Sequence, residues 1–376
     1  MIIKRLRNIK SIAITSSKGG TGKSVISVSL AYTLAHLGFK TLLIDMDLFT
    51  GGTTFYTLSD FTIKVEIGLQ DVFLMENEKK ISSNIIMPIQ IPNDFCKGNL
   101  FLLPAISNSK KNKAELSLSN KFYDSSRFNL ILKYIIDQFE NQGFDYIIID
   151  TRGGSDFTSI NSVLAADGFI FVTEADKTSW DTGRLFFNTI EDTKNQEQDI
   201  SCFGFIINKN VLPSGAIETF LKKEWEMPHL ATIPLDVNTV KYFQLDQVPI
   251  VEDISNSLSF GVLTCIEKIL PINDWEYEKT AKFKQLRYKS MEIEKKNRII
   301  KAKVKNMSRI LQIMQFFMSS LLISLFTAFF FNKSFSYEVI ILFSVISIVL
   351  IIINILSIFF KNRLEKIEKY FDKLIF

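Results

Sequence analysis

Histidine and cysteine are scarce in this chain of 376 residues, which holds two histidines and three cysteines. His36 and His229 are too few to build a histidine metal cluster or a catalytic triad. Cys96, Cys202 and Cys265 have neither C-x-x-C nor metal-like spacing, so we expect reduced, structural thiols. These two absences direct the search for function away from histidine and cysteine chemistry.

The N-terminus lacks the apolar core of a signal peptide, although residues 1–10 are basic. Charge is unevenly distributed: residues 281–310 hold 11 Lys and Arg against 2 Asp and Glu, and residues 361–376 hold 5 against 3. Subtracting these segments from the total of +4 leaves −7 on residues 1–280. Because the N-terminus lacks the apolar core of a signal peptide, we expect the catalytic part to be cytoplasmic. An acidic region is a poor non-specific binder of nucleic acid, so we expect no nucleic-acid partner.

A glycine-rich segment near the N-terminus, S-K-G-G-T-G-K-S at residues 17–24, has the pattern of a phosphate-binding loop. It follows the apolar run 11–15 and precedes residues 25–36, which have a helical pattern, and this context favours nucleotide binding. We expect Lys23 to reach the β- and γ-phosphates and the Ser24 hydroxyl to be a magnesium ligand. The nucleotide-binding residues predicted in the loop are Gly19, Gly20, Thr21, Gly22, Lys23, Ser24 and Val25.

The loop begins with a second lysine, Lys18, and K-G-G-T-G-K-S resembles the deviant Walker A motif of the MinD/ParA family of P-loop ATPases. In that family the first lysine reaches across a dimer interface to the nucleotide of the other subunit. The resemblance implies ATP and Mg²⁺ as cofactors, a homodimer around sandwiched ATP, and catalytic roles for Lys18 and Lys23. The alternative for Lys18 is a solvated side chain at the edge of a loop.

The apolar run 39–45 is expected to be a buried parallel strand, and it leads into Asp45-Met46-Asp47. Acidic residues at the carboxyl end of a parallel strand lie where α/β sheets bind ligands. MinD/ParA proteins carry D-x-D at this distance from the loop. By that resemblance Asp47 is catalytic and positions or activates the attacking water, and Asp45 supports the magnesium shell. Helix capping or turn formation is the alternative for both aspartates.

A second apolar run, 144–150, ends in Asp150 and has the Walker B pattern, in which the aspartate holds magnesium through water. The next residues, T-R-G-G, match the second switch of many ParA-like proteins. By the resemblance, Gly153 or Gly154 offers an N–H to the γ-phosphate, so this loop is expected to differ between ATP and ADP states. The alternative is a strand that ends in a tight turn.

Two further matches indicate which residues bind the base of the nucleotide. The predicted strand 201–207 ends in Asn208, where family members place an asparagine on the adenine ring, and A-T-I-P-L-D at 231–236 resembles the loop that closes over the base. The resemblance therefore makes Asn208, Pro234 and Asp236 base-binding residues, although asparagine and proline at strand ends are often turn formers. The matches run in family order over about residues 10–270.

Beyond this region the chain continues with a charged segment of helical character and two uncharged apolar segments, 310–331 and 339–360, of 22 residues each. At 1.5 Å per residue each reaches about 33 Å, enough to cross a hydrocarbon core of about 30 Å. Basic residues flank the outer ends of both segments, so the positive-inside rule places both ends in the cytoplasm. The sequence predicts a hairpin in the inner membrane that contacts lipid.

The sequence thus predicts an α/β fold with a doubly wound, mostly parallel sheet, followed by a helical linker and two transmembrane helices. The predicted parts are a MinD/ParA-like ATPase domain at 1–272, a juxtamembrane linker at 273–309, a transmembrane hairpin at 310–360 and a basic cytoplasmic tail at 361–376.

The predicted function is a multi-pass, membrane-anchored ATPase that dimerises around Mg-ATP and switches its interaction with an unidentified protein partner. The alternatives are a bacterial tyrosine autokinase, a DNA-partitioning ATPase and a scaffold that senses ATP without hydrolysis. The autokinase family usually lacks a lysine like Lys18 and ends in a tyrosine cluster, whereas the last residues here offer only Tyr370. The acidic charge of residues 1–280 counts against DNA partitioning.

Overall fold

The computed structural model describes residues 10–58, 65–74, 85–89, 100–107, 122–194, 200–211 and 215–292, and scattered residues from 295 to 337. The chain divides into two compact units, Met1–Ser290 and Met291–Phe376, and the elements below belong to the first. The second predicted membrane span and the whole tail lie outside the described residues, as does most of the first span. In the described part, no helix is both long and apolar enough to cross a membrane.

The first unit is built on a sheet whose eight described strands follow the order β3-β4-β2-β5-β1-β6-β7-β8. All neighbouring strands are parallel except β3 and β4, which are antiparallel. The strands are β1 (Ser11–Thr15), β2 (Thr41–Asp45), β3 (Met87–Pro88), β4 (Leu100–Leu103), β5 (Tyr146–Asp150), β6 (Gly168–Glu174), β7 (Ser201–Asn210) and β8 (His229–Pro234). The expected mostly parallel α/β sheet is confirmed.

The central strands are buried on both faces because their side chains are almost all aliphatic. Strands β2 and β5 read T-L-L-I-D and Y-I-I-I-D, and every residue of both is buried. Strand β1 lies between β5 and β6, and the chain reverses the direction in which it adds strands at this point. Parallel α/β sheets bind ligands at such a switch point, outside the carboxyl ends of the strands.

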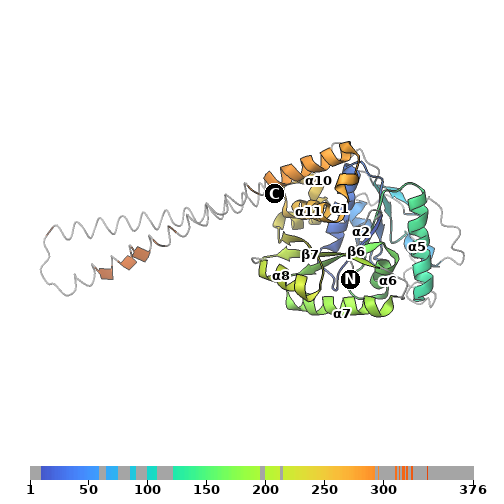
Figure 1. Ribbon diagram of the computed structural model, residues 1–376, viewed down its shortest axis with the longest axis horizontal. Helices are drawn as coiled ribbons and strands as arrows, with labels where there is room; N and C mark the ends of the chain where they lie inside the picture. The colour runs from blue at the N-terminus through green and yellow to red at the C-terminus, as the bar shows by residue number, and fades with distance from the viewer. Residues whose placement is uncertain are drawn as a thin grey trace. The chain divides into compact units, whose positions relative to one another are not determined.

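Helices cover both faces of the sheet (Figure 1). One face is packed by α1 (Lys23–His36), α10 (Pro249–Glu252) and α11 (Ser257–Ile269). The other is packed by α3 (Leu69–Leu74), α5 (Ser125–Asn141), α6 (Phe157–Ala165), α7 (Lys177–Thr193) and α8 (Gly215–Glu224). The short elements α2 (Gly52–Thr57), α9 (Val237–Gln244) and η3 (Ile272–Asp274) lie in the connections.

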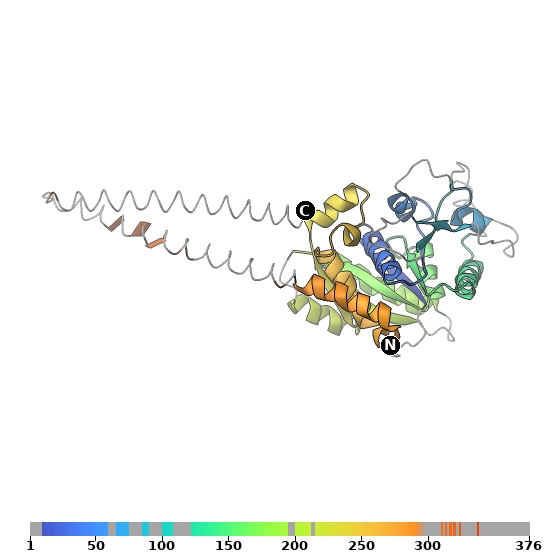
Figure 2. The same ribbon diagram turned by 90° about the horizontal axis from the view of Figure 1, so that it is seen from above.

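Residues 277–292 form a further helix that follows η3, drawn in orange in Figure 2. Phe283 and Leu286 of this helix are buried in the same core cluster as the apolar face of α1. The Arg287 guanidinium lies over the Phe260 ring of α11. The first part of the predicted linker therefore packs on the sheet-containing unit, which extends to Ser290.

Candidate functional site

The glycine-rich loop connects β1 to α1, as the sequence predicts, and its geometry depends on Gly22. Gly22 caps the helix at φ +89°, a left-handed conformation that favours glycine. A Cβ at this position would lie 2.3 Å from Asn208 Nδ2. That amide donates a hydrogen bond to the Thr21 carbonyl oxygen at 2.7 Å. The end of β7 thus packs directly on the loop, which excludes any side chain at Gly22.

Lys23 is a buried cation at the first position of α1, with a relative exposure of 6%. Burial lowers the pKa of its ammonium group, and the negative charges of Asp150, Asp47 and Asp156 act in the opposite direction. An ammonium group in this position, at a helix N-terminus, is suited to bind phosphate oxygens.

Asp45 and Asp150 end neighbouring strands and are register partners in the sheet. Asp150 is 1% exposed and accepts hydrogen bonds from Ser27 Oγ at 2.7 Å and Thr53 Oγ1 at 2.5 Å. Burial raises the pKa of Asp150, and the Lys23 charge and the hydroxyl donors, including Ser24, partly offset this shift.

Asp45 is held by its own loop. One of its oxygens accepts from the backbone N and the Oγ1 of Thr54, both at 2.7 Å, and the other accepts from the Asp47 backbone N at 3.0 Å. Burial, together with the charge of Asp150, raises the pKa of Asp45 to about 7 despite these hydrogen bonds. Asp45 therefore orders the segment that carries Asp47.

The donor set around Asp150 fits a magnesium ion bound together with a nucleotide. Mg²⁺ is usually held in such sites by one or two carboxylates, water and substrate phosphates. Ser24 and Asp150 are adjacent through a hydrogen bond, and Asp45 lies beside them. Among the described residues no group of three or more His, Cys, Asp or Glu could hold a metal alone. Phosphate oxygens of the nucleotide would complete the shell of the ion.

Asp47, the predicted catalytic aspartate, lies nearer to solvent than Asp45, with 22% of its side chain exposed. Its carboxylate accepts a hydrogen bond from the Thr50 hydroxyl. Arg152 Nε lies 3.9 Å from Asp47 Oδ1, and Arg152 Nη1 lies 3.7 Å from Asp156 Oδ2. Arg152 thus connects the segments that follow β2 and β5.

Gly153 follows Arg152 and lies against the glycine-rich loop. A Cβ on Gly153 would meet the Gly19 Cα at 2.6 Å and the Lys18 carbonyl oxygen at 2.8 Å. The neighbouring Gly154 N donates to the Ser16 carbonyl oxygen at 3.0 Å. The turn after β5 is therefore in direct backbone contact with the loop, and the Gly154 N–H, one of the two predicted donors to a γ-phosphate, is bound to Ser16 in this structure.

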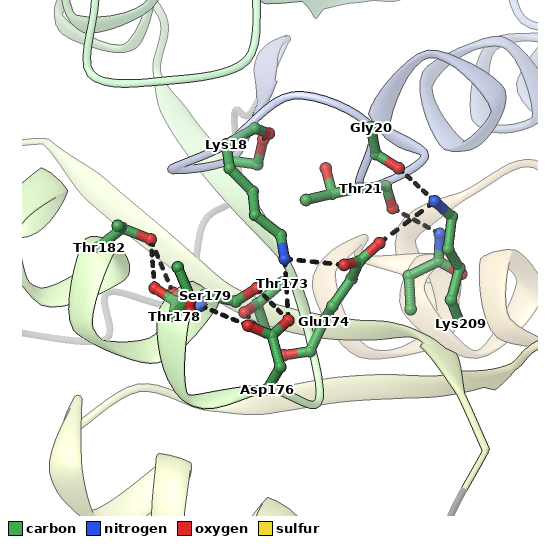
Figure 3. Close-up of polar contacts among 12 residues, drawn as sticks. Lys18, Gly20, Thr21, Thr173, Glu174, Asp176, Thr178, Ser179, Thr182 and Lys209 are labelled. Carbon is green, nitrogen blue, oxygen red and sulfur yellow. Dashed lines mark hydrogen bonds and ion pairs between the residues drawn. The ribbon is translucent and has the colours of Figure 1, made fainter.

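Lys18 has two carboxylate partners within its own chain (Figure 3). Its Nζ lies 2.8 Å from Glu174 Oε2, at the end of β6, and 2.8 Å from Asp176 Oδ2, at the N-cap of α7. Burial lowers the pKa of Lys18, but hydrogen bonds and charges from Asp176 and Glu174 outweigh it and the net shift is upward. Burial raises the pKa of Asp176, yet hydrogen bonds from Lys18 and Ser179 bring it down to about 2.

The structure thus gives Lys18 specific ion pairs rather than the fully solvated position of the alternative interpretation. The backbone of its partner Glu174 is also fixed, because Trp180 Nε1 donates a hydrogen bond to the Glu174 carbonyl oxygen at 3.1 Å. A contact of Lys18 with a second subunit would have to exchange these partners for a phosphate.

A cavity of about 330 Å³ lies beside the loop and is large enough for a nucleoside. Its lining includes the three predicted base-binding residues, Asn208, Pro234 and Asp236, together with Lys209 and Phe243. Asp236 also caps α9, since its carboxylate accepts from Asn238 N at 2.9 Å.

The structure gathers every predicted site residue around one edge of the sheet, and it adds residues that sequence reasoning missed. The additional residues are Ser27, Thr53, Thr54, Arg152, Glu174, Asp176 and Lys209. Asp176 alone carried a local signal, since Asp176-Lys177-Thr178-Ser179 is a helix N-cap pattern. The others contribute through contacts between different segments of the chain, such as those from α1 and α2 to the ends of β5 and β2, which no sequence spacing reveals.

A mostly parallel α/β sheet with a K-G-G-x-G-K-S loop at its switch point defines a P-loop nucleotide-binding protein with a MinD-like fold. The family model described as "AAA domain" matches residues 9–202, and the chain belongs to this family.

Two of its relatives belong to different functional groups. The tyrosine-protein kinase CpsD of Streptococcus agalactiae is 34% identical over 203 residues, which cover 53% of this chain and 75% of that protein. The septum site-determining protein MinD of Buchnera aphidicola is 28% identical over 200 residues, covering 50% of this chain and 62% of that protein. The solved structure of MinD complexed with Mg-ADP from Pyrococcus horikoshii has a TM-score of 0.55 at 19% identity, covering 70% of this chain and 97% of that one.

Proposed function

We propose that this protein is a MinD/ParA-like ATPase that dimerises around Mg-ATP and uses hydrolysis to switch its interaction with a partner protein at the cytoplasmic face of the membrane. ATP and Mg²⁺ are its cofactors. The observation that carries the proposal is the convergence of Lys18, Lys23, Asp47 and Asp150 on one loop at the carboxyl edge of the sheet.

Each residue has a chemical role in this proposal. Lys23 binds the β- and γ-phosphates, and Ser24 and Asp150 hold the magnesium ion, which neutralises phosphate charge. Asp47 orients the attacking water, and Arg152 restrains the Asp47 carboxylate between turnovers. Lys18 leaves its own carboxylate partners and stabilises phosphoryl charge on the nucleotide of the second subunit.

Membrane anchoring is part of the proposal and is supported by sequence pattern and exposure. The described residues Ile310, Ile313, Phe316, Phe317 and Ile323 are helical, and each is more than half exposed. Large exposed apolar side chains at this spacing are unfavourable in water and are normally covered by lipid or protein. We infer a helical hairpin in the inner membrane, with the ATPase unit in the cytoplasm.

A tyrosine kinase is the second candidate, favoured by the 34% identity to CpsD. Its phosphoryl acceptor would be a tyrosine hydroxyl instead of water, while Lys23, Ser24 and Asp150 would serve the same nucleotide. Incubating the purified chain with radiolabelled ATP separates the two candidates. Release of inorganic phosphate without phosphotyrosine supports the ATPase, and stable phosphotyrosine on the chain or on an added partner supports the kinase.

The test of the main proposal is the mass of the full chain in detergent, measured by light scattering with ATP·Mg and with ADP·Mg. We expect an ATP-dependent dimer that Asp47→Ala stabilises and Lys18→Ala weakens, with ATP turnover lost in both. Lys133→Ala, an exposed lysine of α5, is the matched control and should behave like the natural chain. A monomer in every nucleotide state would overturn the sandwich dimer.

A further inference from the structure

The Glu174 carboxylate bridges two lysines, Lys18 at the start of the glycine-rich loop and Lys209 near the end of β7. Its Oε2 lies 2.8 Å from Lys18 Nζ and its Oε1 lies 3.2 Å from Lys209 Nζ. Figure 3 shows the carboxylate between the two ammonium groups, with the loop directly beside them. The Glu174 side chain is 24% exposed, so the bridge is partly shielded from solvent.

Lys209 is placed at the loop by an unusual backbone conformation. It adopts φ +54°, which lysine rarely does, at a point where the register of β7 and β8 shifts. This conformation directs its Nζ to the Gly20 carbonyl oxygen, while the preceding Asn208 binds the Thr21 carbonyl oxygen. Non-glycine residues in this region tend to cluster at ligand-binding sites.

The same lysine lines the nucleoside cavity together with Gly20 and Lys23. A nucleotide that enters the cavity brings its phosphates to the loop, within the region that the Lys209 ammonium group occupies. A phosphate oxygen and the Glu174 carboxylate are both strong acceptors for an ammonium group. The two anions therefore require the same donors.

We propose that Lys209 is a ligand of the nucleotide polyphosphate and that Glu174 competes with the nucleotide for Lys209 and Lys18. The Glu174 carboxylate holds both lysines until the chain's own nucleotide takes Lys209, and Lys18 then exchanges the carboxylate for a phosphate of the second subunit's nucleotide. Glu174 is a positioning residue that lowers nucleotide affinity and holds Lys18 until a phosphate replaces it. This inference rests on the nucleotide binding proposed above.

The test is the affinity of the full chain in detergent for ATP·Mg and ADP·Mg, measured by isothermal titration calorimetry. Glu174→Gln keeps the shape of the side chain and removes its charge, so we expect both nucleotides to bind about three- to tenfold more tightly. Lys209→Met should weaken both by a similar factor. Glu191→Gln, which removes the same charge from an exposed site of α7, is the matched control and should change nothing.

Two further measurements separate competition from a structural effect. The gain from Glu174→Gln should shrink as sodium chloride is raised, because a competing charge is screened. The gain should also fall in the Lys209→Met background, because coupled residues are not additive.

Unchanged or weaker nucleotide binding by Glu174→Gln, with the natural chain binding normally, would overturn this inference alone. A natural chain that binds neither nucleotide would overturn the proposed function and this inference together.

Discussion

The carboxylates on the two sides of the glycine-rich loop are held in opposite ways. At the ends of β2 and β5, Asp45 and Asp150 are fully buried and bound mainly by hydroxyl and backbone N–H groups. At the end of β6, Glu174 and Asp176 are partly exposed and bound by lysine.

The difference in solvent exposure explains which function suits each pair of carboxylates. Two desolvated carboxylates at neighbouring positions disfavour their own ionisation, so they gain most from a metal cation beside Asp150. Exposed or half-exposed ion pairs contribute little free energy and can be exchanged at low cost. The buried side is therefore suited to fix a magnesium ion, and the exposed side is suited to exchange partners.

Removing the buried cation should have the largest effect on the site. Lys23→Ala takes away the ammonium group that faces the phosphates, and we expect ATP affinity to fall about 10- to 100-fold. Calorimetry on the full chain measures this loss, with Lys133→Ala as the exposed control. A change of less than about twofold would show that Lys23 does not bind the phosphates.

A methyl group between the loop and the turn after β5 should have the next largest effect. In Gly153→Ala the new Cβ would meet the Gly19 backbone. The shifts that such overpacking forces typically lower the free energy of unfolding by about 1–3 kcal/mol. We also expect nucleotide affinity to fall about tenfold, since the loop must move. Gly52→Ala is the control, because a Cβ there meets nothing within 4 Å. Equal behaviour of the two variants would contradict the close contact.

Removing one hydroxyl donor from each pair of carboxylates tests the difference between the buried pair and the partly exposed pair directly. Thr54→Val takes a donor from Asp45 and an acceptor from the Ala105 N–H, both buried, and should cost about 1–3 kcal/mol. Ser179→Ala takes a donor from the half-exposed Asp176 and should cost less than about 1 kcal/mol. Urea unfolding of the full chain measures both variants. The reverse order would refute the difference between the two sides.

The smallest expected effect is on the stability of the fold at low pH, through Asp176. The folded pKa of Asp176, about 2, lies below its ordinary value of 3.8, so the carboxylate stabilises the fold above pH 3.8 and loses this contribution as pH falls toward 2. The side chain is 43% exposed, and screening leaves about 0.5 kcal/mol or less. Asp176→Asn should thus be slightly less stable than the natural chain near neutral pH and equal to it near pH 2. A difference that persists at pH 2 would exclude this origin.

The loop and the strand ends were predictable because each is encoded in a continuous stretch. The pattern of apolar run, glycines and lysine specifies the loop, and Asp45 and Asp150 follow strands whose aliphatic side chains require burial on both faces. The parallel sheet then brings these strand ends together.

The exposed side was not predictable, because it depends on strand order and on one backbone dihedral. Nothing in the spacing of Glu174 and Lys209 shows that β6 and β7 are neighbours, or that φ of Lys209 is positive. The docking of residues 277–292 was missed for a related reason: a few apolar side chains, such as Phe283, bury a helix whose composition is otherwise charged.

The hydrogen bond between Trp180 and the Glu174 backbone gives the chain an internal optical reporter. Indole emission responds to the electric field and hydrogen bonding at its nitrogen, so a displacement at the end of β6 should change the colour of Trp180 fluorescence. The other two tryptophans lie in different surroundings, Trp225 packed against Phe171 and Phe205 in the core and Trp275 hydrogen-bonded to the Tyr146 hydroxyl. Rapid mixing with ATP can therefore time the release of Lys18 without any added dye.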